Sequence, residues 1–228
     1  MVRLATLDFD NSILDALNRD RLVIFAGAGV SVGSPSNLAN FWTLAEQIAH
    51  GTGKEPYVPL DRFLGELSHD GVTVHERAGK HLSPPESAPN ALHHDLVRLF
   101  GKPDRVKIIT TNYDLHFETA ADTVFSSRPE IYAAPALRLG SDFSGIVHVH
   151  GALPKTRNLI MTDADFGRAY LTEGWAKQFL LDVFSHYTVL FIGYSHDDVV
   201  MNYLARALPS GRSERRFALT ETGLPPFQ

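Results

Sequence analysis

Cysteine is absent from the 228-residue sequence. Its absence excludes disulfide bonds, a catalytic thiol and a zinc site built on cysteine ligands. Long apolar runs are absent as well, since the longest have the length of a strand and fall well short of the ~20 residues that span a bilayer. The first ten residues carry two acidic side chains and no long apolar run, so they do not read as a secretory signal. We therefore expect a cytoplasmic protein without a membrane partner.

A strong charge of one sign is also lacking. The formal net charge is −5, and a mildly acidic chain lacks the basic surface of a dedicated nucleic-acid binder. One local basic cluster, made of Arg206, Arg212, Arg215 and Arg216, is typical of a solvated helix end and loop, and a contact with a phosphate or a partner is the alternative. We expect no direct binding of nucleic acid.

The sequence does contain alternating strand and helix patterns. Short runs rich in β-branched or aromatic residues predict strands at 22–26, 106–110, 146–149, 188–192 and 216–220, and a weaker one at 130–134. Apolar residues at helical spacing predict helices at 11–20, 38–50, 90–100, 113–121, 173–186 and 198–208. The strands are apolar throughout, which indicates a parallel sheet covered on both faces. We therefore predict a Rossmann-like α/β fold with helices on both faces of the sheet.

The segment 51–89 interrupts this alternation. It contains five prolines and five glycines, which predicts either an irregular or small helical insert over the site or a plain surface connection. We interpret residues 1–228 as a single domain that includes this insert. Because the chain stops in LPPFQ soon after the last predicted strand, we expect it to be the N-terminal part of a longer protein.

Four of the predicted strands end in polar or glycine-rich residues. These ends are Gly27-Ala28-Gly29-Val30-Ser31, Thr111-Asn112-Tyr113-Asp114, His150-Gly151 and Gly193-Tyr194-Ser195. Ligands of open parallel sheets bind in the crevice at the carboxyl ends of the strands. The four ends are therefore predicted to converge on one binding site.

The first of these ends is rich in glycine. Without a Cβ, Gly27 and Gly29 allow backbone N–H groups to approach a pyrophosphate closely, although a tight strand-to-helix turn without a ligand would look the same. The spacing up to Gly33 is G-x-G-x-x-x-G rather than the G-x-G-x-x-G of dehydrogenases. No second strand ending in an acid follows about 20 residues later. Both observations argue against a nicotinamide dehydrogenase.

The second and third ends carry the side chains best suited to chemistry. Asn112 or Asp114 could cap the helix expected to start near residue 114, but the polar run is longer than one cap needs. His148 and His150 are two residues apart, so on a continuous strand they share a face. Such a pair could ligate a metal, but no third ligand is evident. His150, which precedes a glycine at the strand end, is better placed for proton transfer.

Two further segments look like helix starts. Asn90 is predicted to cap a helix with at least one of His93 and His94 on its outer face, and we assign these histidines no chemistry. Asp198 suits the first turn of a helix. Ser195 could contact a ribose or phosphate, or could cap that helix.

Taken together, the four strand-end motifs resemble those of the sirtuin superfamily in their order and spacing, over about residues 20 to 220. The helix start Pro89-Asn90-x-x-His93 is also similar to theirs. The chain departs from the deacylases of this superfamily, because it has no four-cysteine zinc ribbon and carries Gly33-Ser34-Pro35-Ser36-Asn37 where they have a Gly-Ile-Pro-Asp-Phe-Arg-like run. These departures are similar to the sirtuin-like domains of bacterial anti-phage defence proteins, a family known for NAD hydrolysis.

The resemblance implies that the chain hydrolyses NAD to nicotinamide and ADP-ribose without zinc. It implies that Asn112 holds the ribose hydroxyls or the attacking water, that His150 is the general base, and that Asp114 binds the nicotinamide carboxamide or orients Asn112. The NAD-binding residues that it implies are Gly27, Ala28, Gly29 and Ser31 around the pyrophosphate, Thr111, Gly193 and Ser195 along the phosphates and adenosine ribose, and Asp198.

Two other functions stay open. The first is an NAD-dependent deacylase or ADP-ribosyltransferase, and the missing zinc cysteines count against the deacylase. The second is a module that senses NAD or ADP-ribose without turnover, against which the presence of both Asn112 and His150 counts. Because a freely active NAD hydrolase would be toxic, we expect control by homo-oligomerisation or by an activating partner or domain.

Overall fold

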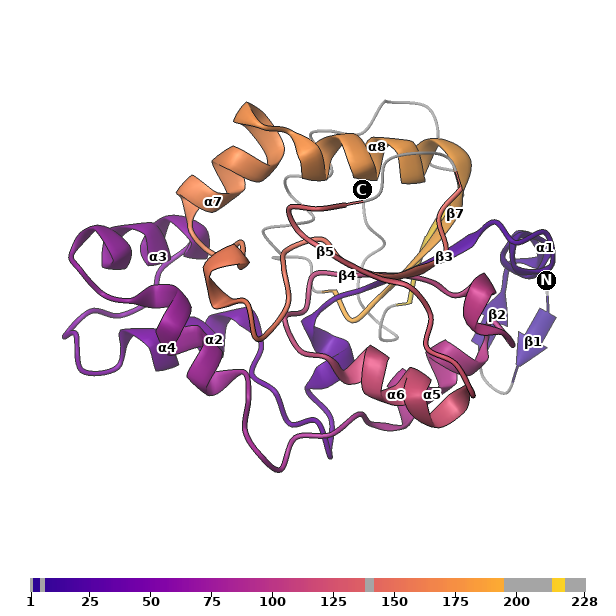
Figure 1. Ribbon diagram of the computed structural model, residues 1–228, viewed down its shortest axis with the longest axis horizontal. Helices are drawn as coiled ribbons and strands as arrows, with labels where there is room; N and C mark the ends of the chain where they lie inside the picture. The colour runs from indigo at the N-terminus through magenta and orange to yellow at the C-terminus, as the bar shows by residue number, and fades with distance from the viewer. Residues whose placement is uncertain (1, 5–6, 138–141, 195–214, 220–228) are drawn as a thin grey trace.

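The structure is a computed structural model that describes residues 2–4, 7–137, 142–194 and 215–219. Its centre is a single six-stranded sheet in which each strand runs parallel to its neighbours (Figure 1). The strands lie in the order β5 (Ile131–Ala133), β6 (Gly145–His148), β4 (Lys107–Thr110), β3 (Leu22–Ala26), β7 (Thr188–Ile192) and β8 (Arg216–Ala218). All six predicted strands are confirmed, with small shifts in their bounds.

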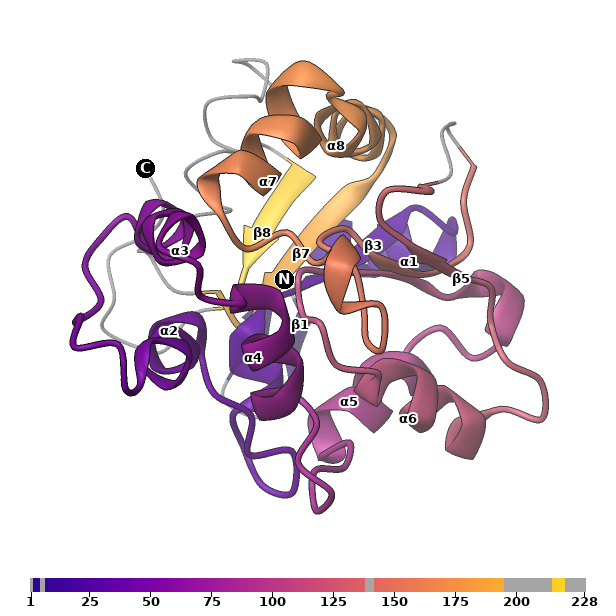
Figure 2. The same ribbon diagram turned by 60° about the vertical axis from the view of Figure 1, so that its left-hand side comes forward.

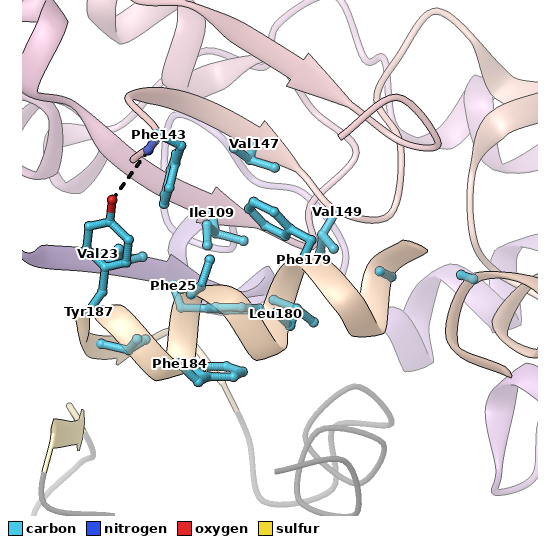
Figure 3. Packing of buried hydrophobic residues seen from close by; sticks show 14 of the residues in the cluster. Val23, Phe25, Ile109, Phe143, Val147, Val149, Phe179, Leu180, Phe184 and Tyr187 are labelled. Carbon is cyan, nitrogen blue, oxygen red and sulfur yellow. Dashed lines mark hydrogen bonds between the residues drawn. The ribbon is translucent and has the colours of Figure 1, made fainter. Parts of the chain in front are cut away.

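Helices cover both faces of the sheet, as predicted. On one face lies α8 (Trp175–His186), and Figure 3 shows how its side chains pack on the strands. Phe25 and Val147 point from the strands toward Phe179 and Leu180 of this helix, and all four side chains are buried. The hydroxyl of Tyr187, just after α8, accepts a hydrogen bond from the backbone N–H of Phe143 at 3.3 Å. The sheet is thereby closed on this face by an aromatic core.

The opposite face is covered by α1 (Asn11–Asn18), α5 (Ala91–Arg98) and α6 (His116–Val124). Successive residues of a strand point to opposite faces. Ile24 therefore packs with Val97 and Phe117 on this side, whereas its neighbour Phe25 belongs to the core under α8. Burial on both faces explains why β3 is apolar at every position.

A helical module lies beside the sheet. It consists of α2 (Phe41–Ala49), α3 (Leu60–His69) and α4 (Val74–His81), and Figure 2 shows these helices grouped at one side of the molecule. They share a core of their own, which includes Leu44 and Leu64 and is joined by Tyr113 and Met161 from the sheet side. The segment 51–89 thus supplies two helices, α3 and α4. The short helix α7 (Asp163–Gly167) contacts α3.

Several boundaries differ from the predictions. α6 begins at His116 rather than near 113, because the Asp114 carboxylate accepts a hydrogen bond from the His116 N–H and the preceding residues form a polar turn. The sequence patterns did not predict α7, the π-helical turn Arg168–Thr172 that follows it, or the hairpin of β1 (Val2–Leu4) and β2 (Leu7–Phe9). The helix predicted at 198–208 lies outside the described residues. Within the described ranges, no helix has the length and apolar character needed to cross a membrane.

Candidate functional site

The loops after β3 and β7 touch each other backbone to backbone. The Gly27 N–H donates to the Ile192 carbonyl and the Gly29 N–H to the Gly193 carbonyl, both at 2.9 Å. A Cβ on Gly29 would lie 2.8 Å from the Gly193 Cα, and Gly193 itself has a φ of +75°. Glycine is needed at these positions because the two loops approach too closely for side chains.

This contact changes which groups of the first loop are available. The N–H groups of Gly27 and Gly29 are already bonded within the protein, so their part in the site is to bring the loop into position. Ala28 and Ser31, from the short 3-10 turn Ala28–Ser31, line the pocket. Of the four residues predicted in this loop, Ala28 and Ser31 therefore line the pocket, whereas Gly27 and Gly29 form the contact between the loops.

The loop after β4 is held in a non-helical turn by its own polar groups. The Asn112 N–H donates to the Thr110 hydroxyl at 3.0 Å, and the Thr111 hydroxyl lies 2.9 Å from the Tyr194 hydroxyl. Tyr194 in turn donates to the carbonyl at the end of β3. These bonds tie three strand ends together and turn Thr111, Asn112 and Asp114 toward the pocket.

Ser31 is the hub of a buried polar network. Its hydroxyl donates to Asp114 Oδ2 at 3.0 Å and accepts from Asn112 Nδ2 at 3.1 Å. His93 Nε2 lies 3.2 Å from the same hydroxyl. All four side chains are at least nine-tenths buried. Buried polar groups that satisfy one another form a rigid unit, so this network holds the Asn112 amide in one place.

His148 and His150 do not share a face, and the interpretation that they do is wrong. His148 ends β6 and points toward α6, where its Nε2 lies 2.5 Å from Glu118 Oε1. β6 stops there, and Gly151 at a φ of +84° turns the chain. His150 consequently packs on the other side of the sheet, edge-on against Phe166. Side chains two residues apart share a face only while the strand continues, and β6 ends at His148, two residues before His150.

The pKa values of the two histidines are also shifted in opposite directions. Burial alone would lower the pKa of His148, but the charge of Glu118 and the hydrogen bonds to Glu118 and to the Asn112 carbonyl raise it above its usual value. Nδ1 donates to the Asn112 carbonyl at 3.0 Å, because a carbonyl oxygen can only accept. His148 therefore supports the loop that carries Asn112 from behind, and it is not among the pocket residues.

His150 is neutral at physiological pH. Its ring is 2% exposed, and burial lowers its pKa to about 3. Nε2 is hydrogen-bonded to the Tyr170 hydroxyl at 2.8 Å. Tyr170 belongs to the π-helical turn, a deviation that is frequent at functional sites. His150 lines the pocket as a neutral imidazole that can accept or donate one proton.

A single pocket brings most of these groups together. It encloses about 600 Å³ of space between its atoms, its open mouth included. Its polar side consists of Ser31, Thr111, Asn112, Asp114 and His150. Its apolar side comes largely from the helical module and from α7, with Leu38, Ala39, Phe41, Leu44, Leu82 and Phe166. The pocket therefore lies between the carboxyl ends of the strands and the helical module.

The sequence patterns identified the polar side of this pocket but not the apolar side. Six of the predicted site residues line it: Ala28, Ser31, Thr111, Asn112, Asp114 and His150. Ser195 and Asp198 lie outside the described residues. Phe166 and Tyr170 were missed, although Thr162 to Asp165 reads T-x-x-D and forms a capping box that marks the start of α7. In the part of the chain that the structure describes, no cluster of three or more acidic or histidine side chains could hold a metal ion.

Comparisons with known proteins agree with this architecture. The model of a family described as the SIR2-like domain matches residues 106–226, just over half of the chain. An uncharacterized protein of Sinorhizobium fredii, y4cA, is 30% identical over 233 aligned residues. The alignment covers 90% of this chain but 19% of that relative, so the chain spans about a fifth of the relative's length.

Proposed function

The chain belongs to the SIR2-like domain family, and from that premise we propose that its pocket binds NAD and hydrolyses the bond between nicotinamide and ribose. The products are nicotinamide and ADP-ribose. The observation that carries the proposal is the placement of Asn112, Asp114 and His150 on the wall of one pocket, at the ends of adjacent parallel strands. The resemblance assigns the chemistry of NAD cleavage to these three residues.

The pocket suits the charge changes of this reaction. Cleavage proceeds through an oxocarbenium-like transition state at the anomeric carbon, and the cationic pyridinium leaves as neutral nicotinamide. No proton has to be supplied to such a leaving group. Apolar surroundings solvate a cation poorly, so the wall formed by Leu44, Leu82 and Phe166 favours the loss of charge on the ring.

Asn112 is the residue that forms a hydrogen bond with the ribose or with the attacking water. One N–H of its amide is engaged by Ser31, and among the described residues no group donates to its Oδ1. The amide therefore offers an acceptor, which fits a ribose hydroxyl or a water molecule. Asp114 acts behind it, because its carboxylate is bonded to Ser31 and to the His116 N–H. Of the two roles implied for Asp114, these bonds favour orientation of Asn112.

His150 is the acceptor for the proton of the water. A pKa of about 3 makes it a weak base in the free protein. A strong base is not required, because water that adds to an oxocarbenium-like centre becomes acidic as the new C–O bond forms. His150 then accepts the proton late in the reaction.

The test is nicotinamide release from NAD by the purified chain, beside Asn112→Ala and His150→Ala. We expect each substitution to lower kcat by about 100-fold or more, since each removes a group that acts on the reacting atoms. Two matched controls lie on exposed helix surfaces: Asn18→Ala on α1 and His69→Ala on α3. Both controls are expected to keep parental turnover.

The outcomes separate the competing functions. Near-normal turnover by Asn112→Ala would overturn the assignment of the site. Binding of NAD by calorimetry without release of nicotinamide by the parent would favour a sensor module. Release that depends on an added acyl-lysine peptide would favour a deacylase.

We also propose that the activity depletes NAD in the cytoplasm of a phage-infected bacterial cell and that oligomerisation, a partner or a further domain controls it. The support is the resemblance to sirtuin-like defence domains and the much greater length of the aligned relative. The same Asn112→Ala variant tests this role in cells. NAD should fall after infection in cells that express the parent, in its full-length context, and should persist with the variant. An equal fall in both would refute the role.

A further inference from the structure

His93 takes no part in the pocket wall, yet it is one of the most buried polar residues of the chain. It lies on α5, is 0% exposed and is not among the pocket residues. Its ring packs edge-on against His116 at 5.3 Å and Phe117 at 4.9 Å between centroids. A polar ring buried this completely has to be satisfied by hydrogen bonds.

The two nitrogens of the ring face different partners. Nδ1 lies 3.2 Å from the Asn90 N–H nitrogen and 2.9 Å from Asn90 Oδ1. Nε2 lies 3.2 Å from Ser31 Oγ. Burial lowers the pKa of His93 to about 4, so at neutral pH the ring carries a single N–H. That hydrogen is either on Nδ1 or on Nε2.

The single hydroxyl hydrogen of Ser31 favours the His93 tautomer that carries its hydrogen on Nε2. Ser31 has one hydroxyl hydrogen, and the Asp114 carboxylate 3.0 Å away needs it to form a charge-assisted bond. The serine oxygen then accepts from Asn112 Nδ2 and from His93 Nε2–H, while His93 Nδ1 accepts from the Asn90 N–H. With the hydrogen on Nε2, Nδ1 faces Asn90 Oδ1 at 2.9 Å with no hydrogen between them, whereas the other tautomer would donate there. The other tautomer, however, leaves the Asn90 N–H without an acceptor and makes Ser31 divide one hydrogen between Asp114 and His93, so it loses two hydrogen bonds for the one that it gains.

The direction of these bonds determines which end of the Asn112 amide faces the pocket. Since Ser31 donates to Asp114, it can only accept from Asn112, so the NH2 group of the amide must point toward Ser31. We propose that His93 is a positioning residue that donates from Nε2 to Ser31 and so fixes the Asn112 amide with its oxygen toward the ligand. The inference rests on the proposed function, because it concerns the same pocket.

The first test reads the tautomer directly and requires no activity. The nitrogen chemical shifts of labelled histidine distinguish an N–H on Nε2 from one on Nδ1. The signal of His93 among the 11 histidines is identified by its loss in His93→Gln, or by its response to Ser31→Ala if the first variant does not fold. A neutral ring protonated at Nε2 is expected. A ring protonated at Nδ1 in the parent protein would overturn the proposal, whatever the chain does with NAD.

The second test is a double-mutant cycle with Ser31. His93→Gln is expected to lower kcat for NAD hydrolysis about tenfold, the factor that corresponds to one hydrogen bond, with a smaller change in KM. In the Ser31→Ala background the same substitution should have little further effect, because His93 acts through Ser31. His94→Gln is the matched control on the next position of α5 and should leave turnover unchanged.

An equal loss in both backgrounds would show that His93 acts on folding or by another route, and would overturn the proposal. If the parent chain binds NAD without hydrolysing it, the cycle is measured on the dissociation constant of NAD instead. The failure of the proposed hydrolysis is thus distinguishable from the failure of the positioning role. Melting temperatures of all variants show whether each protein is folded when it is assayed.

Discussion

The two sides of the sheet at the end of β6 use the same residue type for opposite purposes. On the α6 side, His148 is fully buried, paired with Glu118 and has a raised pKa. On the α7 side, His150 is buried among aromatic rings, is bonded to a tyrosine hydroxyl and has a pKa lowered to about 3. The comparison teaches that burial alone does not determine the pKa of a histidine, since both side chains are buried and their partners shift the two pKa values in opposite directions.

The largest expected effect on stability comes from removing the His148 side chain, which is paired with Glu118. His148→Ala leaves the Glu118 carboxylate buried without its counter-charge, and Oε2 of Glu118 already has no hydrogen-bond partner in the described part of the chain. We expect a loss of about 3–5 kcal/mol in the free energy of unfolding, measured by urea denaturation. The control is Asp95→Ala, which breaks an exposed pair with Arg98 and should cost less than about 1 kcal/mol. Equal costs for the two variants would contradict the view of His148 as a buried structural charge.

Lowering the pH should affect the contributions of His150 and His148 to stability in opposite directions. The pKa of His150 is about 3 in the folded protein and about 6.5 when unfolded. The stability that its neutral form contributes is therefore present above pH 6.5 and is lost as the pH falls toward 3. Between pH 7 and pH 5 this amounts to about 2 kcal/mol. His148 behaves in the opposite sense, because stability from a raised pKa is present below pH 6.5 and is lost only as the pH rises.

This difference is measured by urea unfolding of the parent and of His150→Ala at both pH values. The variant should lose less stability on acidification than the parent, whereas His69→Ala, with its exposed ring, should keep the parental pH dependence. An unchanged pH dependence in His150→Ala would show that this residue is not neutralised by burial.

The smallest expected effect concerns the tyrosine partner of His150. Tyr170→Phe removes the hydroxyl 2.8 Å from His150 Nε2 and should cost about 1 kcal/mol of stability. Tyr187→Phe removes a comparable bond to the Phe143 N–H on the same side of the sheet, away from the pocket. Both variants should be similarly stable, but only Tyr170→Phe should lower the rate of nicotinamide release. A similar rate in both would remove Tyr170 from the site.

Much of the fold could be predicted because its signals are local. Each strand is a short apolar run, and the capping residues Asn90 and Asn40 mark the starts of α5 and α2. The polar side of the pocket was also accessible, since polar residues that follow buried strands must gather at one edge of a parallel sheet. The segment 51–89 was expected, as one of two alternatives, to lie over the site, but its lining residues were not predicted, because amphipathic helices such as α3 and α4 do not reveal which side chains line a pocket.

The sequence by itself determined the class of the fold, the glycines at the close contact of two loops and the polar residues at the strand ends. Only the tertiary structure decided which of these residues act together. Ser31 meets His93 from 62 positions away and Asp114 from 83 positions away. His148 and His150 receive opposite partners because β6 ends between them. Periodicity records the local conformation of a chain, whereas the charge and proton position of a buried side chain depend on neighbours that only folding brings near.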